Sequence, residues 1–191
     1  MIQKYIRSKR AFLAVLLLFV MAIATNAQDR YFTKSGDITF FSKAPLEDIE
    51  AKNKSVTAVL DTKTGTLQFA VLMKGFEFKK DLMQEHFNEN YVESDKYPRS
   101  EFKGTLINNS EINYQKPGTY TAKVRGQLTI HGITRDIETT GSLKVDSDNL
   151  KANASFPILL SDYKISIPAI VKDKVSNTIN VSVDCKLEPL K

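Results

Sequence analysis

Residues 120–145 read YTAKVRGQLTIHGITRDIETTGSLKV, and this stretch decides the fold. From Tyr120 to Ile130 an apolar face and a polar face alternate at every residue. Alternation with a period of two is typical of an antiparallel strand that is buried on one side. His131-Gly132 then supplies a two-residue turn, because glycine readily adopts positive φ, and a second alternating run follows it. The stretch therefore predicts a β-hairpin.

Other alternating segments recur along the chain, and short turns join most of them. Together with the hairpin they predict an all-β protein of about eight antiparallel strands, folded as a barrel or a sandwich. No linker or charge block divides the chain after residue 27, so residues 28–191 are expected to form one domain. The further strands are expected at residues 37–42, 55–61, 66–74, 101–107, 149–160 and 174–187.

One segment departs from the β pattern. Residues from Lys79 to Phe87 are good helix formers, and Leu82, Met83 and Phe87 are its apolar members. The segment predicts a short helix that lies across an end or opening of the β-structure.

The first 27 residues have the three parts of a secretory signal peptide. A basic start is followed by an uncharged apolar run from Ala11 to Ala24, and Thr25-Asn26-Ala27 offers small residues at a cleavage site. The run is short for a membrane-spanning helix, which needs about 20 residues. An uncleaved anchor is the alternative. We expect cleavage before Gln28 and a periplasmic mature protein without stable membrane insertion.

Charge and cysteine content narrow the function classes further. The whole chain carries a formal charge of +5, but four positive charges belong to the first 27 residues, so the mature chain is +1. This near-neutral balance gives no reason to expect a nucleic-acid partner. Cys185 is the single cysteine and lies on the apolar face of the last strand, which predicts a buried, inert thiol.

Residues that would support catalysis or metal binding are few. The two histidines, His86 and His131, have no metal-ligand spacing, and Ser161-Asp162 lacks the glycines of a nucleophile elbow. His131, in a tight turn, is expected to be exposed to solvent. No enzyme activity, metal or cofactor is predicted.

Several side chains on the inward face of the hairpin are unusually small. Ala122, Gly126 and Gly141 stand where a packed sheet would hold bulky β-branched residues. An eight-stranded barrel can fill its interior with side chains or keep room for one small ligand. Small residues can equally make space for large neighbours across a packed core. The pattern alone leaves a cavity and a packed core equally open.

The segment from Phe78 to Tyr91 is followed by YPRSEFKG at 97–104, GQLTIHGIT at 126–134, FPI at 156–158 and SDYKI at 161–165. Together these motifs resemble the YceI-like family of secreted bacterial proteins. They occur in the family's order and cover nearly all of the mature chain. Residues 38–45 lack the histidine that usually ends the family's first strand, so the chain resembles a divergent branch. The hairpin motif GQLTIHGIT at 126–134 is the most diagnostic match.

The resemblance implies a lipocalin-like, eight-stranded antiparallel barrel with a helix near its mouth. It also implies an apolar tunnel that holds a polyisoprenoid or another long lipid in some members, which favours the cavity over the packed core. An alkyl chain would gain about 0.8 kcal/mol per buried methylene. The candidate lipid-binding residues are Phe69, Val71, Met73, Phe76, Phe78, Leu82, Phe87, Ala122, Val124, Gly126, Leu128, Ala152, Ala154, Phe156, Ile158, Ile179, Val181 and Val183.

The favoured function is thus a periplasmic carrier of an isoprenoid or similar long apolar lipid. The alternative is an interaction protein of the cell envelope with a packed barrel and no bound lipid. An enzyme that acts on a bound lipid is the third possibility, and the sequence gives it the least support.

Overall fold

The computed structural model describes residues 29–190, so the predicted signal peptide lies outside the described residues. Strands dominate this part of the chain. They are β1 (Arg30–Lys43), β2 (Asp48–Asp61), β3 (Thr66–Leu72), β4 (Glu77–Phe78), β5 (Arg99–Leu106), β6 (Gly118–Ile130), β7 (Ile133–Val145), β8 (Leu150–Leu159) and β9 (Thr178–Pro189).

The helical elements are short. The α-helix α2 (Asp81–His86) is followed at once by the π-helical turn η2 (Phe87–Tyr91). None of the helices between residues 29 and 190 has the length and apolar character needed to cross a membrane. The other elements are the 3₁₀ turns η1 (Met73–Gly75), η3 (Asn109–Glu111), η4 (Leu160–Tyr163) and η5 (Ala169–Val171).

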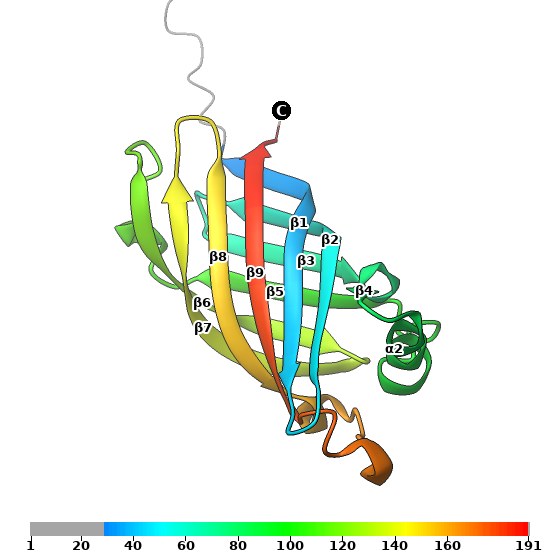
Figure 1. Cartoon of the computed structure of the whole chain (residues 1–191). Helices are drawn as coiled ribbons and strands as arrows, with labels where there is room; N and C mark the ends of the chain where they lie inside the picture. The colour runs from blue at the N-terminus through cyan, green and yellow to red at the C-terminus, as the bar shows by residue number, and fades with distance from the viewer. Residues whose placement is uncertain (1–28, 191) are drawn as a thin grey trace, which may run out of the picture.

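Eight strands form a closed antiparallel barrel. Their order is β1-β9-β8-β7-β6-β5-β3-β2, and pairing of β1 with β2 closes the ring. The two-residue β4 adds to β2 where Ala51 pairs with Phe78. Figure 1 shows α2 beside one end of the barrel, while β9 runs toward the other end. The predicted barrel and its short helix are confirmed.

The hairpin that decides the fold forms as its alternation predicts. β6 and β7 pair without a register shift from Gly118 opposite Val145 to Ile130 opposite Ile133. At the turn His131 has φ 51° and Gly132 has φ 71°. Two consecutive positive φ values are those of a type I′ turn, which fits the twist of the two strands.

The first two strands extend further than the predicted segments. The added part of β2 carries charged residues outward and Ile49, Ala51 and Asn53 inward, so a polar residue interrupts its apolar face. Asn53 is completely buried, and its Nδ2 donates to the Leu72 carbonyl at 2.8 Å while its Oδ1 accepts from the Ser55 N–H at 2.9 Å. A buried amide with both bonds satisfied is tolerated in a core. In contrast, β9 begins at Thr178 rather than at residue 174, and α2 is shorter than residues 79–87.

One end of the barrel is tightly packed. Leu60, Leu150 and Leu187, from three different strands, are each at most 1% exposed. They belong to a cluster that also contains Leu143 and Val145. This cluster closes the barrel at the end where β9 terminates.

Candidate functional site

A cavity of about 500 Å³ occupies the half of the barrel nearest α2. Every one of the eight barrel strands contributes side chains to its wall, and the packed leucines Leu60 and Leu187 form its floor. Residues of α2 and η2 complete the wall at the open end. A cavity of this volume is within the range of small-molecule binding sites, about 300–1,000 Å³.

The burial of inward side chains reflects this empty space. Val124, Leu128, Phe156 and Val181 face the barrel interior, yet each is only half-buried. In a packed core such side chains would have neighbours on all sides and would be fully buried. The two halves of the barrel therefore differ, one filled by aliphatic side chains and one hollow.

All but one of the candidate lipid-binding residues line the cavity, and the exception is Gly126. Gly126 stands opposite Gly104 on β5, and the Phe102 ring covers the pair. A Cβ at position 126 would lie only 2.7 Å from Phe102 Cζ. At this position the small residue serves close packing against a large neighbour, and Gly126 is not among the residues that line the cavity.

Of the strand pairs that close the cavity wall, β7 and β8 are paired over only part of their length. The two strands pair only from Val145 opposite Leu150 to Gly141 opposite Ala154. Beyond that point, toward the open end, β7 is bonded to β6 alone and β8 to β9 alone. Gly141 and Ala154 both border the cavity. Small side chains at the last paired position thus coincide with the place where the barrel widens.

Four phenylalanine rings hold the helical segment against the barrel. Phe87 lies 5.4 Å from Phe40, 5.7 Å from Phe76 and 5.0 Å from Phe78, measured between ring centroids. The first contact is stacked, the second edge-on and the third tilted, and such arrangements are favourable for aromatic pairs. Phe40 was not among the predicted lining residues, although its alternation with Ile38 and Ser42 on one face of β1 would have identified it.

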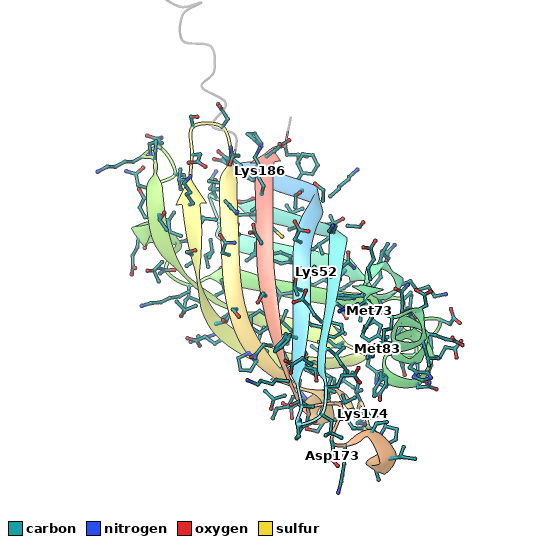
Figure 2. The ribbon with its side chains drawn as sticks, in the orientation of Figure 1. Lys52, Met73, Met83, Asp173, Lys174 and Lys186 are labelled. Carbon is teal, nitrogen blue, oxygen red and sulfur yellow. The ribbon has the colours of Figure 1, made fainter. Side chains whose placement is uncertain are left out.

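The open end carries the charged groups of the cavity wall. Lys80 Nζ donates to Glu47 Oε1 at 2.8 Å, and this hydrogen bond is the main reason that the pKa of Glu47 is lowered. Lys174 contributes through its charge. Figure 2 shows Met83 and Lys174 toward this end of the molecule. The interior wall is apolar, so the site separates a charged rim from a hydrophobic chamber.

His131 does not have the exposed position expected of a turn residue. Its side chain is 13% exposed, its Nε2 lies 2.6 Å from Glu93 Oε2, and its Nδ1 lies 3.1 Å from the Tyr163 carbonyl. Each ring nitrogen thus has a partner within hydrogen-bonding distance. The Tyr97 ring packs edge-on against the imidazole, with centroids 4.6 Å apart. His131 therefore ties the segment after η2 to η4 at the open end.

Metal-ligating side chains are dispersed over the described part of the chain. Within residues 29–190 no three His, Cys, Asp or Glu side chains lie close enough together to hold a metal ion. Cys185 is fully buried on β9, and burial raises the pKa of its thiol to about 12. The expected burial of this cysteine is confirmed.

Comparison with known proteins adds a family and a set of similar folds. The model of the YceI-like domain matches residues 25–187. No curated protein matches the chain.

Among solved structures, a polyisoprenoid-binding domain from Saccharophagus degradans, implicated in plant cell wall breakdown, superposes with a TM-score of 0.74 at 13% identity, covering 85% of this chain and 99% of that one. BcnA of Burkholderia cenocepacia gives a TM-score of 0.65 at 15% identity, covering 80% and 95%. A Campylobacter jejuni YCEI protein gives 0.55 at 19% identity, covering 73% and 84%.

At identities of 13% to 19%, the solved structures show only that the fold is shared. The match to the YceI-like domain model shows to which family the chain belongs. It spans nearly all of the residues that form the barrel, from before β1 into β9. The chain therefore belongs to the YceI-like family.

Proposed function

We propose that this protein binds a long apolar lipid, of the isoprenoid type, in the barrel cavity and carries it through the periplasm. The observation that supports the proposal most directly is the hollow half of the barrel, whose wall is apolar and whose charged groups stand at the open end. The Saccharophagus degradans neighbour is described as polyisoprenoid-binding, and its fold is shared here.

The free energy of binding would come from burying the lipid chain. Each methylene removed from water contributes about 0.8 kcal/mol, and a preformed apolar chamber needs little rearrangement. A charged head group would lose its hydration if it entered the chamber, at a cost of several kcal/mol. We therefore expect the chain to lie inside and a polar head group to remain at the rim beside Lys80, Glu47 and Lys174.

The alternative, an envelope interaction protein without a bound lipid, requires a packed barrel. The half-buried state of inward residues such as Phe156 and Val181 counts against it.

Binding of isoprenoid alcohols to the delipidated protein tests the proposal. Native mass spectrometry should show one bound molecule, and Val181→Phe, which occupies part of the chamber, should bind shorter chains than the wild type. Ser182→Phe is the matched control because the neighbouring Ser182 is exposed on the outer face of β9. Absence of binding by wild-type protein, or an equal effect of both substitutions, would contradict a ligand in this cavity.

A further inference from the structure

The stretch in which β7 and β8 are unpaired has a cause in the sequence of β8. In the described part of the chain no backbone hydrogen bond joins residues 133–140 of β7 to residues 155–159 of β8. Pro157 lies in this part of β8 and has no N–H to donate to a neighbouring strand. Proline in sheets is confined to edge strands, first positions and bulges. The sequence thus favours the unpaired stretch, which we call the slot.

The slot lies beside a shallow hollow on the outer face of the barrel. Gly141, Ala154 and Val183 border both the cavity and this hollow. At Gly141 and Ala154 the wall carries no side chain larger than a methyl group, so little material separates the two spaces. Threonine and serine side chains of β1, β7, β8 and β9 line much of the hollow. Polar surface therefore lies next to the apolar cavity at the slot.

Thr139 brings a hydroxyl to the inner side of the slot. It stands between Ile137 and Gly141 on the inward face of β7, lines the cavity and is half-buried. Its hydroxyl has no hydrogen-bond partner among residues 29–190. A hydroxyl in an apolar wall is favourable only when it can form hydrogen bonds, so a partner from outside the chain is expected for it.

Two other hydroxyls at inward strand positions of the cavity wall differ from Thr139, because the protein itself engages them. Ser42 Oγ accepts from the Ser176 N–H at 2.9 Å. Ser100 Oγ lies 3.0 Å from Met73 Sδ. Of these three wall hydroxyls, the one at the slot is thus the one available to a ligand.

Each of the two acidic residues that line the hollow has a lysine nearby. Asp184 Oδ2 lies 3.1 Å from Lys151 Nζ. The pKa of Lys52 is raised, mainly by its hydrogen bond to Glu50 and further by the charge of Asp37. An ionic group gains little beside such a balanced surface, whereas an uncharged oxygen can still form a hydrogen bond.

We propose that Thr139 makes the slot a recognition site for an uncharged oxygen group, a hydroxyl or a carbonyl, on the part of the lipid that lies inside the cavity. The proposal rests on the proposed lipid binding. A threonine hydroxyl can donate one hydrogen bond and accept two, so it suits either group. A plain hydrocarbon would cover the hydroxyl without offering a partner, which is unfavourable. Thr139 would thus select chains that carry oxygen.

Two probes of equal length test the assignment: heptadecane and dioctyl ketone, which differ by one carbonyl at mid-chain. Thr139→Val replaces the hydroxyl by a methyl group of similar size. Displacement of a fluorescent polyene from the lipid-free protein measures both affinities. Relative to heptadecane, the affinity for the ketone should fall about fivefold in Thr139→Val, which is the effect of one neutral hydrogen bond.

Two controls accompany this variant. Thr139→Ser keeps the hydroxyl and should retain the wild-type ratio of the two affinities. Ser100→Ala is the matched control, because that hydroxyl already has a partner in the protein, and it should leave the ratio unchanged. The infrared carbonyl stretch of the bound ketone gives a second measurement. It should lie at lower frequency in the wild type than in Thr139→Val, since accepting a hydrogen bond weakens the C=O bond.

The outcomes separate this site from lipid carriage in general. An unchanged ratio in Thr139→Val, with both probes bound, would overturn the recognition site alone. An effect of Tyr91→Phe in its place would assign the carbonyl to the open end. A loss of unfolding free energy in lipid-free Thr139→Val would also overturn the site, by showing that the protein engages this hydroxyl. Wild-type protein that binds neither probe would refute the carriage and the recognition site together.

Discussion

Replacing Ala154 by leucine in the lipid-free protein distinguishes an empty cavity from a packed core by the sign of one measurement. Ala154 lies at the last paired position of β8, opposite Gly141 on β7 and Val183 on β9, and borders the cavity. Leucine adds three carbon atoms on the inward face. Each could contribute about 0.8 kcal/mol when it is buried, which sets a ceiling of about 2 kcal/mol on the gain.

If the core were already filled at Ala154, the loss of stability would be of comparable size. Added methylenes in a filled core force strained rotamers and cost about 1–3 kcal/mol. Ala58 supplies the matched control, because it is 0% exposed in the packed cluster at the closed end. We expect Ala58→Leu to lower the free energy of unfolding by that amount and Ala154→Leu to leave it unchanged or raise it.

Urea unfolding followed by circular dichroism measures both variants. For a domain of this size a gain of 1 kcal/mol raises the melting temperature by about 2–4 °C, so thermal unfolding gives a second reading. Binding of an isoprenoid alcohol should fall in Ala154→Leu, since part of the chamber is then filled. If Ala154→Leu loses as much stability as Ala58→Leu, the reasoning that places empty space at this level of the barrel is refuted.

Three further predictions concern the helical segment and the core. Phe87→Ala removes the ring that contacts three other phenylalanines, so the free energy of unfolding should fall by roughly 2 kcal/mol in urea titrations; an unchanged midpoint would mean that the rings do not hold η2 in place. His131→Ala removes the link to Glu93 and should speed amide hydrogen exchange in residues 87–93, while equal protection in both proteins would argue against that link. The Cys185 thiol, with its pKa raised to about 12, should resist alkylation at pH 8 until the protein unfolds. Rapid labelling of the native protein at pH 8 would contradict this prediction. The raised pKa also means that the neutral thiol stabilises the folded state below about pH 9 and that this contribution to stability is lost as the pH rises toward 12. Cys185→Ala should lessen that loss of stability.

The sequence predicted the barrel well because alternation records which face of a strand is buried. β6 and β7 carry that signal over their whole length and form in the predicted register. The added part of β2 was missed because the polar Asn53 interrupts the alternation of Ile49 and Ala51, and its hydrogen-bond partners are formed only in the fold. Local residue types cannot reveal a buried amide that is satisfied by distant backbone groups.

The candidate site could likewise be predicted from the sequence only in part. Gly126 and Ala154 are both small and inward, yet one packs under Phe102 and the other borders the cavity. Cross-strand neighbours decide between these outcomes, and they depend on the register between β5 and β6 or between β7 and β8. The exposure of His131 was mispredicted because its partners, Glu93 and Tyr163, come from segments that are distant in the sequence.

The central claim is that the cavity holds an apolar lipid chain in the protein's own setting. Native mass spectrometry of the protein, purified without detergent from the cells that naturally produce it, measures this directly. We expect a complex heavier than the mature chain by one long-chain apolar molecule, which organic extraction releases and which Ala154→Leu retains less well. A native mass equal to that of the polypeptide alone, with no extractable lipid, would contradict the account.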